Sequence, residues 1–503
     1  MKRRNKIAVA TSMILIGATV AILAVSDNKD NLEVDQIVHV PIRSFAINLN
    51  PRSMADVESK KVATTLHAGL VAVDWDGTVR ARVAESWSRD DVGLWRFEIK
   101  QGVTLSDGTP VTAETIIGSL CSNMQPGRSI WAWSLKSIEH KTTDEATECT
   151  GLSADGNRTV LIRESDPAPW FLEALAGPAG WIVPADAEGG EYGDIPGVGP
   201  YKIKEIVADS YVTVTARDTG AIPAHSDEIR FSYTADETAM AGAFKRGALD
   251  VLEIDSPVIR DILIHNGQLI GDGKLIQVPS DKTRIVIINL PNLVKKGFSE
   301  SDADWFVEAY SRAVDRTRIG SLMEFIGEPI TTAFPPYADN AGFLNRPDPI
   351  HDRPFPTVNL EVISQNDQFS NNLAGLLPSS VGGVSLTTRV VNKGALINAL
   401  IEKEYDVASM LIESTVKAPV FWASFWRSDS PFVTFGRAIP EMDNLKFVYS
   451  GDVRAAAELI DRKGNWIGIA RQFTNVAVST SINGVRLTGS GQLSFEEIIP
   501  KDR

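Results

Sequence analysis

Hydrophobic and polar positions alternate with two different periods along the chain, and the pattern does not repeat internally. A period of two, typical of half-buried strands, occurs at residues 36–40 and 94–99. Helical spacing occurs at 54–69, and Thr112 is typical of the residue that caps a helix, here one beginning at 113. Strand and helix signals then alternate toward the C-terminus, which predicts an α/β fold.

Turn signals divide this pattern further. Asp76-Gly77 predicts a hairpin at residues 71–79. A stretch rich in Gly and Pro at 189–200 has the composition of a linker and predicts a domain boundary. The remaining predicted strands lie at 160–162, 201–206, 212–214, 228–232, 285–289, 358–363 and 386–391, and the remaining helices at 170–175, 236–245, 303–314, 369–377, 394–402 and 454–459.

The first 26 residues have the pattern of an export signal. Four basic residues among the first six precede an uncharged, mostly apolar run at 7–25, and Ala24-Val25-Ser26 offers small residues for cleavage. The run is also long enough to span a bilayer. Two interpretations stay open: a cleaved signal peptide, or an uncleaved helix that tethers the protein to the inner membrane. Both predict that the remaining chain is periplasmic.

Composition narrows the function classes. Lys and Arg number 50 and Asp and Glu 64, so the net charge is −14, which argues against nucleic-acid binding because that needs a basic footprint. The six histidines have no metal-binding spacing, and neither a His-Glu-x-x-His nor a Gly-x-Ser-x-Gly motif occurs. We therefore predict no catalytic residues, no metal and no cofactor.

Cys121 and Cys149 are the two cysteines of the chain. Export exposes both to oxidation, which favours a disulfide that closes a loop of about 28 residues. Two separate buried thiols are the alternative.

Four dispersed motifs carry a resemblance to a known family. The first comprises LVAVDWDG at 70–77, VAESW at 83–87, WRF at 95–97 and GVTLSDGTPVTAE at 102–114. The others are GVGPY at 197–201, FKRGALD at 244–250 and SRAVDR at 311–316. In this order and spacing, the chain from about 36 to 430 resembles the periplasmic solute-binding proteins of ABC importers, in the oligopeptide, dipeptide and nickel-binding family.

The resemblance implies an α/β, two-lobed periplasmic-binding-protein fold of class II, which closes about a hinge and carries an extra domain inserted in the first lobe. The first lobe would comprise 27–68, 196–258 and 470–503, the inserted domain 69–195, and the second lobe 259–469. The boundary predicted at 189–200 agrees with this division. The chain from 464 on resembles the family only loosely, which predicts a shortened second lobe.

The resemblance also implies the function: a monomeric protein that captures a small ligand, a peptide or peptide-like compound, between its lobes and delivers it to an ABC permease. The alternative hypothesis is a membrane-tethered derivative outside transport, acting as a sensor or interaction partner. A hydrolase has little support.

In the family's peptide-binding members, a second-lobe carboxylate captures the ammonium group of the peptide. By alignment Thr415 takes its place, within Glu413-Ser414-Thr415. A hydroxyl cannot neutralise a buried ammonium. In a strand, Glu413 would face the same side as Thr415 and compensate for the missing carboxylate; otherwise the alignment is displaced by two residues.

Other candidate ligand contacts follow from the family's cleft positions. The opening strand corresponds to residues 43–46, where Arg43 has the geometry to bind a carboxylate or phosphate. Trp422 and Trp426 share a face if their segment is helical, and such rings can stack on a flat ligand. The alternative for Arg43 is an exposed surface charge, and the alternative for the two tryptophans is core packing. The remaining candidates are Phe45, Glu253, Asp255 and Arg284.

Overall fold

In the computed structural model, the elements described below all belong to the unit that extends from residue 36 to the C-terminus. The predicted export segment at 1–26 lies outside the described residues. Within the described ranges, none of the helices has the length and apolar character needed to cross a bilayer. The described residues are 37–501 except 46, 55, 75, 144, 166, 219, 334–354, 367, 414–421, 424, 429–436, 444–452 and 489–490.

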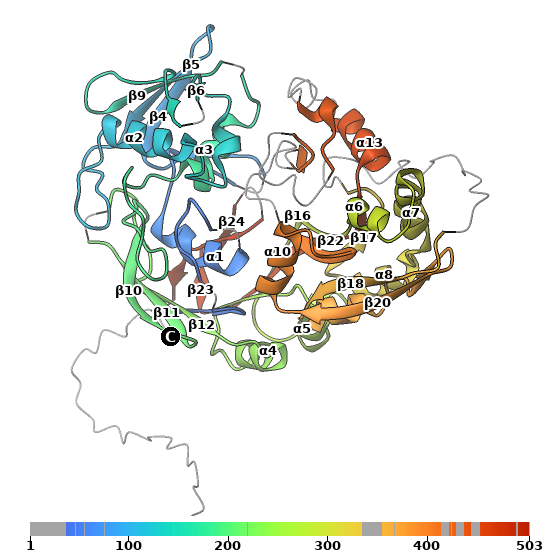
Figure 1. The fold of residues 1–503 in the computed structure, drawn as a ribbon. Helices are drawn as coiled ribbons and strands as arrows, with labels where there is room; N and C mark the ends of the chain where they lie inside the picture. The colour runs from blue at the N-terminus through green and yellow to red at the C-terminus, as the bar shows by residue number, and fades with distance from the viewer. Residues whose placement is uncertain are drawn as a thin grey trace, which may run out of the picture. The chain divides into compact units, whose positions relative to one another are not determined.

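A four-stranded sheet joins the start of the unit to the chain after residue 200, in the order β1-β12-β11-β10 (Figure 1). β1 (Ile37–Ile42) and β12 (Glu228–Tyr233) are parallel, whereas β11 (Tyr211–Ala216) and β10 (Tyr201–Val207) add antiparallel pairs. One face of this sheet and helix α1 (Val57–Leu66) share a hydrophobic core. The period-two pattern thus buries alternate side chains, as predicted.

A second four-stranded sheet has the order β4-β5-β9-β8 and is antiparallel throughout. In sequence, its strands lie between β1 and the other three strands of the first sheet. Thr112 caps α2 (Ala113–Met124) through a capping box, as its position predicts. Cys121 of that helix and Cys149 form a disulfide. The other elements of this segment are β2 (Val71–Val73), β3 (Val79–Ala81), β4 (Ala84–Arg89), β5 (Leu94–Ile99), β6 (Lys141–Thr142), β7 (Thr147–Glu148), β8 (Leu152–Ala154), β9 (Thr159–Arg163) and α3 (Phe171–Ala176).

An eight-stranded mixed sheet follows the path β13-β22-β16-β21-β18-β20-β19, with β17 beside β22. Two long strands, β16 (Lys274–Ile288) and β22 (Trp466–Val478), pair antiparallel along most of their length. The short β13 (Val251–Glu253) joins one end of β22, and β21 (Val407–Ile412) joins the other end of β16. The long pair therefore connects the region near the first sheet to a parallel part built from β21, β18 and β20.

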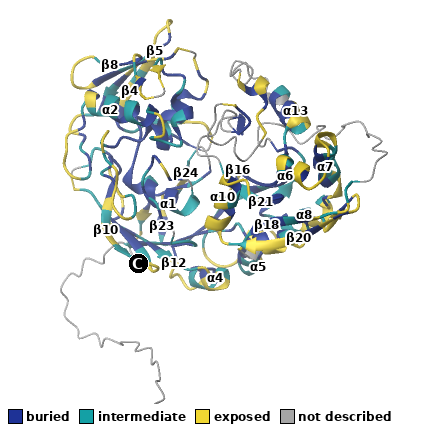
Figure 2. Ribbon diagram, in the orientation of Figure 1, coloured by how far each residue is buried: buried dark blue, intermediate teal, exposed yellow. Residues whose placement is uncertain are grey.

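The remaining strands and helices complete this second half of the unit. β20 lies near the sheet edge and is largely exposed (Figure 2). The elements are β14 (Ile264–His265), β15 (Gln268–Leu269), β17 (Gly327–Pro329), β18 (Asn359–Gln365), β19 (Ser380–Val381), β20 (Val384–Val391), α4 (Glu237–Lys245), α5 (Pro257–Leu263), α6 (Leu290–Lys295), α7 (Glu300–Ala313), α8 (Arg316–Met323), α9 (Gln368–Ala374), α10 (Lys393–Ile401) and α13 (Val453–Lys463).

The C-terminal segment returns to the first sheet. Four two-residue strands, β23 (Ile482–Asn483), β24 (Arg486–Leu487), β25 (Leu493–Ser494) and β26 (Ile499–Pro500), pair within this segment. Phe495 is buried against Phe231 of β12, with ring centroids 5.4 Å apart. The end of the chain thus completes the core that its beginning started.

Candidate functional site

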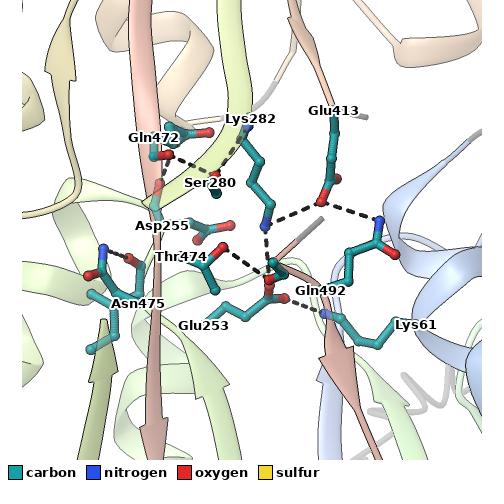
Figure 3. A network of polar contacts seen from close by, with 12 residues as sticks. Lys61, Glu253, Asp255, Ser280, Lys282, Glu413, Gln472, Thr474, Asn475 and Gln492 are labelled. Atoms are coloured by element: carbon teal, nitrogen blue, oxygen red, sulfur yellow. Dashed lines mark hydrogen bonds and ion pairs between the residues drawn. The ribbon is translucent and has the colours of Figure 1, made fainter. Parts of the chain in front are cut away.

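A bulge in β16 directs Lys282 toward several carboxylates. The pairing with β22 shifts register between Pro279 and Thr283, and Pro279 has no N–H to donate to a ladder. The Ser280 hydroxyl donates to the Gln472 carbonyl at 2.8 Å and accepts from the Lys282 N–H at 3.1 Å. Figure 3 shows the Lys282 side chain extending from this bulge toward Glu253 and Glu413.

Ion pairs connect elements that lie far apart in sequence. The Lys282 Nζ lies 3.3 Å from Glu253 Oε1 and 3.8 Å from Glu413 Oε1. The Lys61 Nζ, from α1, lies 2.7 Å from Glu253 Oε2 (Figure 3). It also lies 3.0 Å from Glu58 Oε2. Glu253, at the end of β13, therefore bridges two ammonium groups.

Burial would favour the neutral form of each group, but the opposite charges outweigh it. The pKa of Glu253 lies well below its usual range because Lys61 and Lys282 stabilise the carboxylate more than burial opposes it. The pKa of Lys282 is raised by Glu413 and Glu253 despite burial, and that of Lys61 is raised by Glu253 and Glu58. All three groups are charged at neutral pH.

Arg43 and Asp255 form a second, bidentate ion pair at the same place. Arg43 donates to Asp255 Oδ2 at 2.6 Å, its other nitrogen lies 2.5 Å from Oδ1, and the Glu253 carbonyl accepts from it at 3.4 Å. Asp255 is thus the carboxylate that Arg43 holds in this structure. The Asp255 carbonyl also accepts from Gln472 at 3.0 Å, which ties this pair to β22.

Glu413 is less completely compensated than the other carboxylates. It directly follows β21, and Gln492 of the C-terminal segment donates to its Oε1 at 3.3 Å (Figure 3). Its side chain is 4 % exposed, and its Oε2 is buried without a hydrogen bond from any described residue. A buried carboxylate oxygen in this state is costly unless a ligand or water donates to it.

We call this group the central charge network. Its carboxylates outnumber its cations by one among the described residues. Its members are the carboxylates Glu58, Glu253, Asp255 and Glu413 and the cations Arg43, Lys61 and Lys282.

Four of the residues predicted from the sequence meet in the central charge network: Arg43, Glu253, Asp255 and Glu413. Two others contact different groups. Arg284 lies 3.9 Å over the ring of Phe369 and donates to Ser370 at 3.1 Å. Phe45 packs edge-on against Tyr192 and Tyr233 at the margin of the first core.

The hypothesis that Trp422 stacks on a ligand needs correction. Trp422 and Trp426 are fully buried, and both contact Phe425, at 6.4 and 6.3 Å between ring centroids. Trp466 of β22 packs on this cluster at 4.6 Å from Trp426. The tryptophans therefore have the alternative role, core packing. Ser414 and Thr415 lie outside the described residues.

Sequence reasoning missed Lys61, Lys282 and Gln492. Lys61 sits three residues after Glu58, a spacing that is typical of a solvated pair on a helix surface. Lys282 lies in a bulge that no local signal marks except Pro279. The contacts that place these residues in the site, with Glu253 and Glu413, come from distant segments and carry no local signal.

A small cavity of about 60 Å³ lies near the central charge network, one helical turn along α1 from Lys61. Arg80 pairs with Asp74 at 2.8 Å, and Arg82 pairs with Glu496, so its charged walls compensate one another. The described residues contain no group of His, Cys, Asp and Glu able to hold a metal ion. The cavity lining comprises Thr64, His67, Ala68, Gly69, Val71, Ala72, Val73, Asp74, Arg80, Arg82, Ala176, Trp181, Thr488, Ser494 and Glu496.

Solved structures share this fold over nearly their whole length. The murein tripeptide binding protein MppA of Escherichia coli superposes with a TM-score of 0.75 at 18% identity, covering 93% of this chain and 99% of that one. OppA of Haemophilus influenzae, solved in complex with RPPGFSPFR, also gives 0.75, at 16% identity and 93% and 100% coverage. These are two-lobed α/β binding proteins.

Sequence comparison points to the same family. The periplasmic oligopeptide-binding protein OppA of Escherichia coli (strain K12) is 26% identical over 226 residues, an alignment that spans 42% of each chain. The family model described as bacterial extracellular solute-binding proteins, family 5 Middle, matches residues 78–352, more than half of the chain. This chain therefore belongs to the bacterial extracellular solute-binding proteins of family 5.

Proposed function

We propose that this protein captures a peptide or peptide-like compound that bears a free ammonium group, between its two lobes, and delivers it to an ABC importer. The observation that carries the proposal is Glu413, a buried carboxylate with one oxygen that accepts no hydrogen bond from the described residues. The excess of one carboxylate in the central charge network supports a ligand with one positive charge. The names of OppA and MppA, both peptide-binding relatives, support the ligand class.

The proposal assigns binding rather than catalysis to the site, as in the family's other members. We further propose the lobe boundaries given by the resemblance: 27–68, 196–258 and 470–503 for the first lobe, 69–195 for the inserted domain and 259–469 for the second lobe. The separate sheets formed by β1 with β10–β12 and by β4–β9 support this division. On it, Glu413 belongs to the second lobe and Lys61 and Gln492 to the first, so the ligand would meet both.

The relatives named periplasmic support an exported protein, and family membership favours transport over the tethered sensor. Cleavage of residues 1–26 and a monomeric state remain part of the proposal. Beyond Glu413, we propose Arg43, Phe45, Glu253 and Asp255 as residues near the ligand, together with Ser414 and Thr415, which follow Glu413 directly.

The proposal can be tested by native mass spectrometry of the purified protein with a synthetic mixture of random tri- to pentapeptides. We expect retained peptides with free N-termini, and no retention after N-acetylation of the same mixture. Glu413→Gln removes the charge at nearly constant shape, and we expect affinity to fall by at least about tenfold. Glu361→Gln is the matched control, because Glu361 is a half-exposed carboxylate that pairs with Arg389. We expect this variant to leave affinity unchanged. The proposal would be contradicted if acetylated peptides were retained as well as free ones, or if no peptide were retained.

A further inference from the structure

Lys282 places an ammonium group of the chain itself between two carboxylates of the central charge network. Its side chain is 6 % exposed, and its Nζ lies within 4 Å of both Glu253 and Glu413. Ser280 fastens the bulge that carries it, because its hydroxyl donates to the Gln472 carbonyl of β22 at 2.8 Å and accepts from the Lys282 N–H at 3.1 Å. The position of Lys282 is therefore built into the fold rather than left to a mobile surface side chain.

Lys282 changes the charge balance of the central charge network. With Lys282, the network of described residues has one carboxylate in excess; without it, the excess would be two. A buried site is most stable when its charges are matched, and a like charge brought close to Lys282 would be repelled. The lysine side chain thus occupies the position that a second cationic group of a ligand would take, and it supplies that positive charge itself.

We propose that Lys282 is a specificity-determining residue that restricts the site to ligands with a single cationic group at the end that meets Glu413. This inference rests on the proposed function. In a ligand with a second cation close to its ammonium group, that second cation meets Lys282 instead of a free carboxylate. Such a ligand therefore binds more weakly.

The test compares the wild-type protein with Lys282→Met, which keeps the length of the side chain and removes its charge. The probe is a mixture of tripeptides with either Ala or Lys in the first position and all residues in the other two, and native mass spectrometry measures the ratio of Lys-first to Ala-first peptides retained. In the wild type we expect a ratio at or below that of the applied mixture. In Lys282→Met we expect it to rise at least tenfold.

Two further variants separate charge from packing. Lys282→Arg keeps the positive charge and is expected to keep the wild-type ratio. The double variant Lys282→Met with Glu253→Gln again has one carboxylate in excess, so we expect its ratio to return to the wild-type value. If thermal melting shows that Lys282→Met does not fold, Lys282→Gln takes its place, because its polar end retains hydrogen bonds to the neighbouring carboxylates.

The outcomes distinguish the two proposals. A wild-type protein that retains Ala-first peptides, with an unchanged ratio in the folded Lys282→Met or Lys282→Gln variant, overturns the role of Lys282 and leaves the proposed function standing. Enrichment of Lys-first peptides by the wild type overturns it equally. Retention of no peptide at all by the wild type overturns the proposed function and this inference together.

Discussion

At the scale of single residues, buried and partly buried charged side chains of the central charge network have partners of opposite sign from other parts of the chain. Glu253 and Lys282 contact at 3.3 Å although 29 positions separate them, and Arg43 and Asp255 are 212 positions apart. Each charge alone would be costly in the interior, and each is stabilised by its partner. The family resemblance suggested Arg43, Glu253, Asp255 and Glu413, but their partners follow only from the fold.

His67 is a buried group of a different kind, since it is held neutral. It stacks on Trp181, with ring centroids 5.6 Å apart, and burial lowers its pKa from 6.5 to about 4. Between these values the unfolded chain binds the proton more readily, so stability is present above pH 6.5 and is lost as the pH falls.

We expect the free energy of unfolding to fall by about 2 kcal/mol between pH 6.5 and 4.5 through His67. Urea denaturation at a series of pH values measures this. His67→Phe keeps an aromatic ring against Trp181 and should flatten the dependence, whereas the exposed His225→Asn should leave it unchanged. A pH dependence that is the same in His67→Phe would show that the histidine is not its source. The contribution of Glu253, whose pKa is depressed, is lost only below its ordinary value near 4.5.

At the scale of elements, the sequence predicted those helices and strands that have a clear alternation, a cap or a turn in their own residues. β5 spans Leu94–Ile99 as the alternation predicts, α2 begins after the cap Thr112, and Gly77 adopts the positive φ of +86° that the hairpin requires. β22 was not predicted. Its residues are buried on both faces, so the strand has no alternation that distinguishes it from other buried segments.

The disulfide connects two elements of the inserted segment that local signals treat separately. It joins Cys121 of α2 to Cys149, just after β7, and closes a loop with a sequence separation of 28. In the chain-entropy model a loop of this length stabilises the folded state by about 3–4 kcal/mol.

We therefore expect Cys121→Ser with Cys149→Ser to lower the free energy of unfolding by about 3–4 kcal/mol relative to the oxidised wild type. Guanidinium denaturation followed by tryptophan fluorescence measures the change, and reduction of the wild type should reproduce most of it. If neither the variant nor reduction altered the midpoint, the disulfide would not contribute to stability. Peptide retention should persist in the folded variant, because Cys121 and Cys149 lie outside the central charge network.

At the scale of the whole described unit, residues near both ends of the described chain share one core, which includes Val38 and Val40 as well as Phe495 and Ile498. Phe495 packs on Phe231, and Arg80 and Arg82 near the start of the inserted segment pair with Glu496 near the end of the chain. The same C-terminal segment supplies Gln492 to Glu413. Loss of packing in this segment should therefore affect both stability and the site.

We expect Phe495→Ala to destabilise the fold by about 3–5 kcal/mol, because it removes a fully buried ring from a close-packed core. Differential scanning calorimetry checks the expectation, and Ile499→Ala, at a position 49 % exposed, is the control with little effect. A small loss in Phe495→Ala would mean that the C-terminal segment merely covers a core that is already complete. Gln492 would also be displaced, so we expect weaker peptide retention in the same variant.

The sequence by itself determined the alternation of strands and helices, the family and its α/β fold, because periodicity, caps and turns act over a few residues and the family motifs occur in order along the chain. It also singled out most of the carboxylates of the site. Only the tertiary structure decided which cations hold them, that Trp422 belongs to a core, and that β22 runs beside β16. These outcomes depend on contacts between distant segments, whose energies appear only when the chain has folded and removed the charges and rings from water.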